Sequence, residues 1–227
     1  MEVETRLELS SAKVLDDLKN YLGTPGFFMD GYLIEKRGET CIRDVYLDTS
    51  RRHFGARGRA MRIRTRDGQL VVSFKEDLKL DSSWAIREDI ELPPGIRARE
   101  KAASWLAEVN LAECVPHEGE TRQFNQIFGQ EIAKWLHVLV EIVTNRTTYR
   151  IAAGNEGCLL ALDAVFYPES GQRSFLVEIE ALGNQSTDHV RKVRDWLLQM
   201  LGSSARPDVG SKVKRGIRFR ELAQRGN

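Results

Sequence analysis

Polar and apolar residues alternate at the start of the chain and at many later places. Within residues 2–9, Glu2, Glu4, Arg6 and Glu8 take every second position, and apolar residues or threonine fill the positions between them. Successive side chains of a β-strand point to opposite faces. The pattern therefore predicts a strand with one apolar face and one ionic face, and the ionic face either is solvated or lines a site.

The two-residue period returns often enough to predict an antiparallel meander of about eight or more strands. Before residue 93 it is found in "YLIEKRG", "CIRDVYLDT", "AMRIRTR", "LVVSFKED" and "WAIREDIEL". After residue 135 it is found in "LHVLVEIVTNRTTYRI", "CLLALDAVFY" and "SFLVEIEAL". Asp67 and Gly68 form a dipeptide that is typical of tight hairpin turns. "GNEG" predicts a second turn further along the chain.

Helices are predicted in three stretches. The first is capped by Ser10 or Ser11 and ended by Gly23, and its apolar stripe is Val14, Leu15, Leu18, Tyr21 and Leu22. Helices with a mixed connection are expected from Arg99 to about Trp135. The last helix carries Val190, Val193, Leu197, Met200 and Leu201 on one face. Because no repeat or long linker divides the chain, we expect one α+β domain over residues 1–227.

The composition limits the classes of partner. The 227 residues include 34 Lys and Arg against 33 Asp and Glu, so no whole-molecule field draws the chain to nucleic acid or to an anionic membrane. The basic stretch "RRHFGARGR" lacks the interleaved aromatic residues of a surface that stacks bases. The three cysteines have no metal-ligand spacing. Because the N-terminus lacks a signal-peptide pattern and no stretch is long enough to span a bilayer, we expect a cytoplasmic protein.

Charges of one sign recur on single strand faces. "AMRIRTR" places Arg62, Arg64 and Arg66 on one face, and "VEIE" places Glu178 and Glu180 on one face. For any single strand a solvated face explains such charges, because antiparallel sheets commonly expose one face to water. Taken together the strands do not fit that explanation, because like charges repel across a shared face and a merely soluble surface intersperses the signs.

The separated charges indicate a ligand that compensates both sets. The cations that suit a polyanion are Arg62, Arg64, Lys75 and Arg146. The acids that would supply oxygen ligands to Mg²⁺ or Mn²⁺ are Glu2, Glu4, Glu178 and Glu180. A divalent metal ion together with a chain of phosphates would satisfy both sets. If the sheet curls into a barrel with the charged faces inward, the apolar alternates face outward and the amphipathic helices cover them.

Short motifs along the whole chain resemble the CYTH superfamily, the triphosphate tunnel metalloenzymes. The N-terminal "EVETR" is similar to its Glu-x-Glu-x-Lys signature, and later motifs are matched by "RDVYLDT", "AMRIRTRDG", "VSFK", "REDIE", "VTNRTTY", "LALD", "VEIEAL" and "GSKVKRG". The superfamily includes inorganic triphosphatases, thiamine-triphosphatases and class IV adenylate cyclases. The resemblance implies an eight-stranded antiparallel β-barrel, a tunnel that binds the triphosphate part of a small-molecule substrate.

By position in these motifs, the resemblance implies a role for each charged residue. Phosphate oxygens would be bound by Arg62, Arg64, Lys75, Arg146 and Lys212, together with Arg6 and Arg87. One or two divalent ions, Mg²⁺ or Mn²⁺, would be held by Glu2, Glu4, Glu178 and Glu180, with Asp163 in support. For Arg87, a structural pairing with Asp89 or Glu91 is an equal alternative.

Two positions bear on the chemistry. Arg6 stands where the signature has lysine; it keeps the positive charge and gains bidentate geometry, but arginine does not donate a proton at neutral pH. Lys75 and Tyr46 match a pair that is thought to act on the leaving group in some thiamine-triphosphatases. A lysine among carboxylates and phosphates keeps its proton, so Lys75 is expected to act as an acid. Tyr46 is as readily explained as an aromatic residue of the barrel wall.

The implied activity is metal-assisted hydrolysis of inorganic triphosphate or of a small organic triphosphate such as thiamine triphosphate. Two alternatives stay open, a class IV-type adenylate cyclase and a non-catalytic module that binds polyphosphate or nucleotide. The cyclase needs a base pocket that the sequence does not mark, and a pure anion binder has no need of the acids. The oligomeric state is not determined by the sequence.

Overall fold

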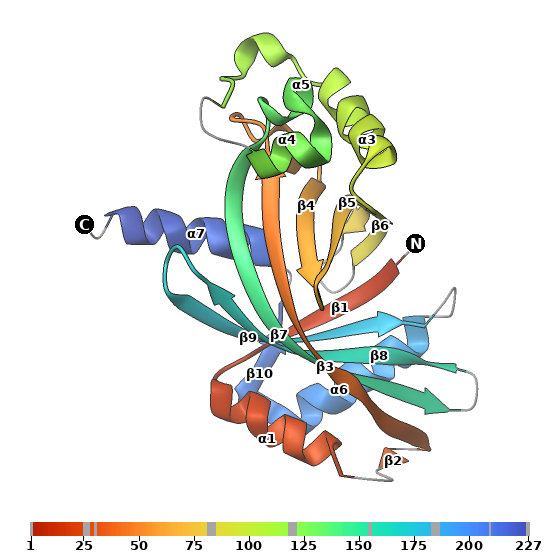
Figure 1. The fold of residues 1–227 in the computed structure, drawn as a ribbon. Helices are drawn as coiled ribbons and strands as arrows, with labels where there is room; N and C mark the ends of the chain where they lie inside the picture. Colours follow the sequence, from red (N-terminus) through yellow and green to blue (C-terminus); the bar gives the residue numbers. More distant parts are fainter. Residues whose placement is uncertain are drawn as a thin grey trace.

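The ring of strands that the sequence predicts is present and closed. The computed structural model describes residues 2–24, 28–29, 31–80, 85–117, 122–153, 156–182, 187–208 and 210–225. Eight antiparallel strands follow the order β1-β6-β5-β4-β3-β7-β8-β9, and a β1–β9 pairing closes the ring (Figure 1). The predicted α+β class with an eight-stranded antiparallel barrel is therefore confirmed.

The strands of the ring match the alternating stretches of the sequence. They are β1 Glu2–Leu9, β3 Tyr32–Asp48, β4 Arg59–Arg66, β5 Gln69–Leu80, β6 Ala85–Leu92, β7 His137–Ala153, β8 Glu156–Tyr167 and β9 Gln172–Ala181. Short strands β2 Phe28–Met29 and β10 Ala205–Pro207 pair with β3 and β1. The stretches "YLIEKRG" and "CIRDVYLDT", predicted as separate strands, form one strand with a register shift between Lys36 and Gly38.

The turn between β4 and β5 has the conformation that the sequence predicts. Asp67 has φ 51° and Gly68 has φ 77°, and a two-residue hairpin turn of this kind requires positive φ at both positions. The turn fixes the β4–β5 register, in which Arg66 lies opposite Gln69 and Arg62 opposite Ser73. Because side-chain direction has a period of two residues, this register also fixes which side chains of β4 and β5 share the inner face.

Seven α-helices lie within the described residues. They are α1 Ala12–Leu22, α2 His53–Ala56, α3 Ile96–Ala107, α4 Arg122–Phe128, α5 Gln130–Ala133, α6 Thr187–Leu201 and α7 Lys212–Arg225. Ser11 caps α1, since its Oγ accepts the Val14 amide at 3.3 Å, and Gly23 follows the last residue of the helix. Two short 3-10 turns, Leu111–Glu113 and Gly202–Ser204, complete the helical elements. The stretch "SKVKRGIRF" has no element predicted from its sequence, and its residues from Lys212 onward begin α7.

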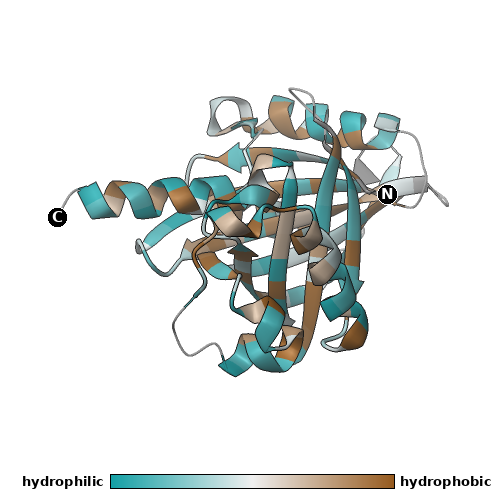
Figure 2. Cartoon of the chain, turned by 90° about the horizontal axis from the view of Figure 1, so that it is seen from above, coloured by the Kyte–Doolittle hydropathy of each residue, from teal (hydrophilic) through white to brown (hydrophobic). Residues whose placement is uncertain are grey.

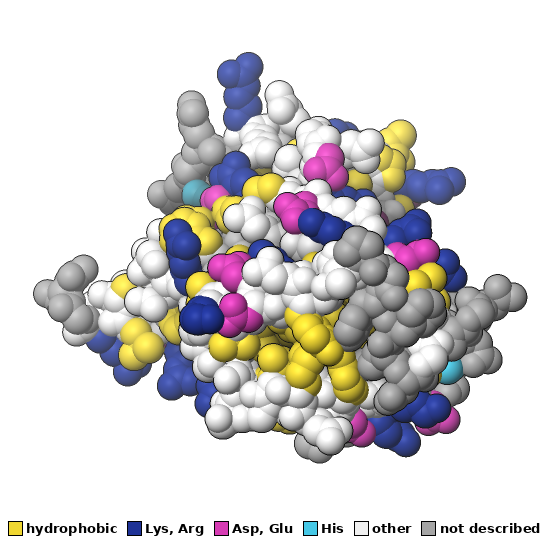
Figure 3. Space-filling model, turned by 90° about the horizontal axis from the view of Figure 1, so that it is seen from below, with side chains coloured by type: hydrophobic (Ala, Val, Ile, Leu, Met, Phe, Trp, Pro, Cys, Tyr) yellow, Lys and Arg dark blue, Asp and Glu magenta, His cyan; other side chains and the backbone are white. Residues whose placement is uncertain are grey.

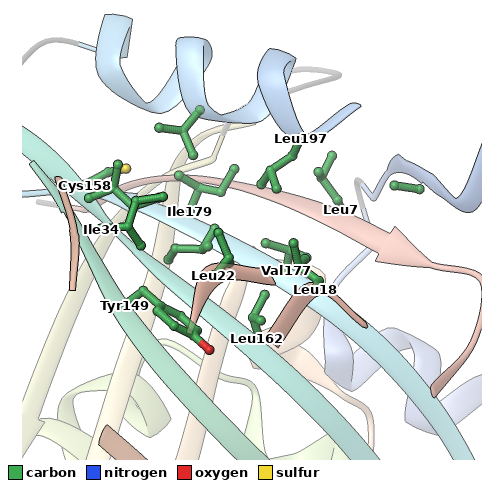
Figure 4. Close-up of a cluster of buried hydrophobic side chains, with 14 of the residues drawn as sticks. Leu7, Leu18, Leu22, Ile34, Tyr149, Cys158, Leu162, Val177, Ile179 and Leu197 are labelled. Carbon is green, nitrogen blue, oxygen red and sulfur yellow. The ribbon is translucent and has the colours of Figure 1, made fainter. Parts of the chain in front are cut away.

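The lower half of the barrel is covered by α1 and α6 (Figures 1 and 4). Leu15, Leu18 and Leu22 of α1 pack with Val177 and Ile179 of β9 in one buried cluster. The cluster also includes Val190, Val193 and Leu197 of α6, which confirms these positions of the predicted apolar face, whereas Met200 is exposed over 37% of its surface. Full burial of each such side chain favours the folded state by about 1.5–3 kcal/mol.

The upper half of the barrel is covered by α3, α4 and α5, and α7 packs against the barrel in a separate hydrophobic cluster. Met61 and Ile63 of β4 pack outward in the cluster that contains Trp105 of α3. Val213 and Phe219 of α7 pack against the cluster of Val140, Tyr167 and neighbouring side chains. Hydrophilic and hydrophobic residues alternate along the strands in Figure 2. Because the outward apolar alternates of β4 and β9 face α1, α3 and α6, the charged alternates face the inside of the ring. The helix α7 packs on this inner face, since Val140 and Tyr167 share their strand faces with Arg146 and Asp163.

The outer surface has a different charge pattern from the inside. On the face seen in Figure 3, basic and acidic side chains are interspersed among polar and apolar ones. Within the described part of the chain, no helix is both long enough and apolar enough to cross a lipid bilayer.

Candidate functional site

The strand register brings opposite charges beside one another inside the barrel. Asp44 lies opposite Arg64, and Lys75 lies opposite Asp89. On the other side of the ring, Arg146 lies opposite Asp163 and Arg6 opposite Glu178. Neighbouring side chains across an antiparallel pair lie within contact distance. Charges of one sign that gather on the face of one strand are therefore compensated by opposite charges on the neighbouring strand.

One cluster is centred on the arginines of β4. Arg64 donates two hydrogen bonds to Asp44, from Nε at 2.8 Å and from NH2 at 2.9 Å. Arg62 donates from NH1 to the Tyr46 hydroxyl at 3.1 Å and from Nε to Ser73 Oγ at 3.1 Å. Arg62 and Asp44 are both buried. Burial opposes the charge of Arg62, but Asp44, Tyr46 and Asp89 together outweigh it and raise the Arg62 pKa above its ordinary value.

Asp44 is a site residue to which the sequence analysis gave no role. Burial alone would raise the pKa of its carboxyl, but the positive charges of Arg62 and Arg64 hold that pKa below its usual value. Asp44 belongs to the quoted motif "RDVYLDT" and lies two residues before Tyr46, on the same face of β3. The two-residue alternation places Asp44 on the charged face of its strand, and this pattern could have identified it as a site residue.

Lys75 joins the same cluster from β5. Its Nζ lies 2.7 Å from Asp89 Oδ2, and Arg62 NH2 lies 4.0 Å from the same oxygen. The second oxygen of Asp89, Oδ1, is buried without a hydrogen-bond partner. A buried carboxylate oxygen without a donor costs free energy, so this position favours the arrival of a further donor or cation.

The second cluster is centred on Glu178 of β9. Its Oε1 receives Arg6 Nε at 2.9 Å and Lys212 Nζ at 3.0 Å, and its Oε2 receives NH2 of Arg146. Burial alone would raise the pKa of Glu178, but Lys212, Arg6 and Arg146 hold it well below its ordinary value. Glu178 is therefore a carboxylate over the whole physiological range.

Asp163 connects Arg146 and Lys212 in this cluster. It is fully buried, and it accepts from Arg146 Nε at 2.8 Å and NH2 at 2.7 Å. Lys212 Nζ reaches the Oδ2 atom of Asp163 at 2.6 Å. Lys212 is the first residue of α7, while Asp163 lies in β8. The structure thus brings Arg6, Arg146, Asp163, Glu178 and Lys212, all predicted site residues, into one network.

The hydrogen-bond partners of Arg87 are Asp77 and Glu4, which differ from the two predicted from its own strand. Its Nε donates to Asp77 Oδ1 at 2.7 Å, and its NH1 donates to Glu4 Oε1. The alternative pairing of Arg87 with Asp89 or Glu91 is not among its observed hydrogen bonds; Asp89 is bonded by Lys75 instead. The reason is register: Arg87 lies opposite Asp77 in the β5–β6 pair and opposite Glu2 in the β1–β6 pair.

Tyr46 and Lys75 lie on strands separated by β4. The Tyr46 hydroxyl accepts from Arg62, and only 6% of the Tyr46 surface is exposed. Its ring also packs in the cluster of Val140 and Tyr167. Tyr46 is thus an aromatic residue of the wall, and its hydroxyl meets the arginine of the charged cluster.

The predicted metal ligands come from three strands, β1, β8 and β9. Glu4 lies directly opposite Glu180 across β1 and β9, and two carboxylates at adjacent positions favour a cation between them. Glu2 lies two residues from Glu4 in β1, and its side chain is outside the described residues. Among the described side chains, no three acidic, histidine or cysteine residues converge as metal ligands. The oxygens of Asp163 and Glu178 are bonded to protein cations.

The closed antiparallel barrel, with paired cations and carboxylates on its inner face, defines the architecture of triphosphate tunnel proteins. The chain belongs to the CYTH family, because residues 1–216 match the family's CYTH domain model. No curated protein matches the chain.

Solved structures have the same fold over almost the whole chain. One is HpAC1 from Hippeastrum, which is named as an adenylyl cyclase candidate and described as having a dominant triphosphatase activity. The two structures have a TM-score of 0.63 and 20% sequence identity, and the match covers 96% of this chain and 95% of HpAC1. An adenylate cyclase candidate from Bacillus halodurans has a TM-score of 0.54 and 17% identity, covering 95% and 96%. A Pyrococcus furiosus protein has a TM-score of 0.52 and 16% identity, covering 94% and 99%.

Proposed function

We propose that the protein is a metal-dependent triphosphatase that hydrolyses inorganic triphosphate or a small organic triphosphate such as thiamine triphosphate. The observation that carries the proposal is the placement of cations from four elements inside one closed barrel. Arg62, Arg64 and Lys75 come from β4 and β5, while Arg146 and Lys212 come from β7 and α7. A linear chain of phosphates bears charge along its length and can meet both groups of cations at once. The activity described for HpAC1 agrees with the proposal.

The arginines and lysines would bind phosphate oxygens. In the structure their guanidinium and ammonium groups are held by Asp44, Asp89, Asp163 and Glu178. Such pairing fixes the rotamers of long side chains before a ligand arrives, and donors that are already oriented stabilise developing charge without reorganisation. Arg87 joins this wall beside Glu4. The cations would neutralise the charge that spreads over the phosphates in the transition state.

A divalent ion, Mg²⁺ or Mn²⁺, is the proposed cofactor. Glu4, Glu178 and Glu180, together with Glu2, are the acids proposed to hold it, with Asp163 in support. When bound, the ion would neutralise phosphate oxygens and lower the pKa of an attacking water.

Lys75 is the proposed proton donor. Its Nζ lies 2.7 Å from Asp89 Oδ2, which holds the side chain in the charged cluster. From there it would donate a proton to the oxygen that leaves when a phosphoanhydride bond breaks. Tyr46 would hold Arg62 in place through its hydroxyl.

The buried Cys158 and the exposed Cys41 are free thiols, consistent with a proposed location in the reducing cytoplasm.

The test is phosphate release from inorganic triphosphate, thiamine triphosphate and ATP, with and without Mg²⁺ or Mn²⁺. We expect metal-dependent release from at least one of them, and strong loss of that release in Glu4→Gln. Full activity of Glu4→Gln would contradict the metal site. Cyclic AMP and pyrophosphate from ATP would identify a cyclase, and tight binding without release with any divalent ion would identify a binding module.

A further inference from the structure

Arg6 makes contacts that a lysine in its place could not make together. Its guanidinium has five N–H groups in a fixed plane, whereas a lysine ammonium is a single point. Arg6 Nε donates to Glu178 Oε1 at 2.9 Å, NH2 lies 3.4 Å from Glu4 Oε1, and NH1 donates to the carbonyl of Gly210 at 2.6 Å. The side chain therefore spans from β9 to the segment that precedes α7.

The main chain of Arg6 holds the same segment at a second point. The Asp208 amide donates to the Arg6 carbonyl at 2.9 Å. Asp208 in turn accepts from the Gly210 amide at 3.1 Å and from Arg215 NH2 at 2.8 Å. The connection between β10 and α7 is thus fixed to β1 through both the backbone and the side chain of Arg6.

The fixed segment determines where Lys212 lies. Ser211 follows Gly210 and caps α7, since its Oγ accepts the Lys214 amide at 3.1 Å and its carbonyl accepts the Arg215 amide at 3.1 Å. Lys212 is the first helical residue, two positions after Gly210. Its Nζ lies 3.0 Å from the same Glu178 Oε1 to which Arg6 donates. Arg6 and Lys212 therefore meet on one oxygen.

We infer that Arg6 is a positioning residue that clamps the start of α7, so that Lys212 is held in the phosphate site, and that Arg6 does not itself bind phosphate. The inference rests on the proposed function for the phosphate site, but the clamp itself is a property of the free protein. A phosphate that took over NH1 of Arg6 would leave the Gly210 carbonyl without this donor. An acceptor on the backbone cannot rotate away as a carboxylate side chain can, and a part-buried carbonyl without a donor is unfavourable.

The first test is hydrogen exchange of the ligand-free protein, comparing wild type with Arg6→Lys. We expect amides of residues 210–216 to exchange at least about tenfold faster in Arg6→Lys, because one charge-assisted hydrogen bond to the segment is lost. Arg87→Lys is the matched control, since Arg87 also bonds Glu4 and has no hydrogen bond to this segment among those observed. Unchanged exchange in Arg6→Lys would overturn the clamp.

The second test is a double-mutant cycle on the binding of inorganic triphosphate with Mg²⁺. Arg6→Lys should weaken binding about tenfold in the wild type and less than about twofold in a Lys212→Ala background, because Arg6 acts through Lys212. Additive effects would show that Arg6 meets the ligand directly. If wild type binds no triphosphate, the proposed function fails while the exchange experiment still decides the clamp.

A measurement on wild type covers the case in which Arg6→Lys does not fold. Saturation with inorganic triphosphate and Mg²⁺ should leave residues 210–216 as protected as in the free protein or better protected. Faster exchange of this segment on binding would show that the ligand displaces Gly210 from Arg6, and it would overturn the inference.

Discussion

Asp44 and Arg64 lie directly opposite each other in the β3–β4 register, and the buried carboxylate accepts two hydrogen bonds from the guanidinium, at 2.8 and 2.9 Å. An exposed pair of similar geometry lies at the preceding residue of β3, where Arg43 donates to Glu141 at 2.7 and 2.9 Å. The two pairs differ chiefly in their surroundings, so together they provide a variant and its control.

Asp44→Asn is expected to lower the free energy of unfolding by about 3–5 kcal/mol, because it leaves the buried Arg62 and the half-buried Arg64 without the carboxylate of Asp44. Glu141→Gln should lower it by no more than about 1 kcal/mol, because an exposed pair is screened by water. Urea unfolding followed by circular dichroism measures both values. Equal effects of the two substitutions would show that burial does not strengthen the Asp44 contact.

The effect of Asp44→Asn should depend on pH in a defined direction. The folded-state pKa of Asp44 is lowered from 3.8 by Arg62 and Arg64 despite burial, so its stabilisation is present above pH 3.8 and is lost as pH falls through the folded value. The stability difference between wild type and Asp44→Asn should therefore stay constant from pH 7 to about pH 5. The stability difference should become smaller below pH 3.8. A difference that grows below pH 3.8 would contradict a lowered pKa of Asp44 in the folded protein.

Lys75→Met should reduce the rate of phosphate release by about 10²–10³-fold, the loss expected when one donor to the transition state is removed. The control is Lys36→Met, because Lys36 bonds Glu39 at 2.7 Å in an exposed pair of β3 and has no proposed role in the site. Steady-state assays with inorganic triphosphate measure both variants. A Lys75→Met enzyme that keeps wild-type turnover would exclude Lys75 as the proton donor.

Gly216→Ala should be destabilising, although replacing glycine by alanine inside a helix ordinarily stabilises by about 0.5–1 kcal/mol. A Cβ atom at Gly216 would lie 2.6 Å from Val140 Cγ2 and 2.9 Å from Tyr167 Cδ1, and overpacking of this kind costs about 1–3 kcal/mol. Thermal unfolding gives the sign of the change. In the control Gly55→Ala, the nearest atom to the new Cβ is Asp48 Oδ2 at 3.4 Å, so a smaller change is expected.

The native protein should react with iodoacetamide at Cys41 and not at Cys158. Cys41 is exposed, while Cys158 is buried and burial raises the pKa of its thiol to about 12; at pH 8 it lacks the thiolate that reacts. Peptide mapping before and after unfolding in urea identifies the labelled residues. Rapid labelling of Cys158 in the folded protein would show that the barrel opens around β8.

Much of the fold was predictable because the signals are local. Alternation along a strand sends side chains to two faces whatever the partner strand is, so the sequence predicted that Arg62, Arg64 and Lys75 share the charged face and that Met61 and Ile63 lie under the helices. The hairpin at Asp67 and Gly68 and the cap at Ser11 depend on conformational preferences of single residues. These features needed no knowledge of distant contacts.

The tertiary structure decided which hydrogen-bond partners each charged residue has. Closure of the ring pairs β1 with both β6 and β9, and the register then gives Arg87 the partners Asp77 and Glu4. The contact from Arg6 to the Gly210 carbonyl joins residues 204 positions apart, and no local pattern can encode such a pair. The sequence by itself determined which charges face inward; only the folded barrel decided which of them compensate one another, because compensation depends on register and closure.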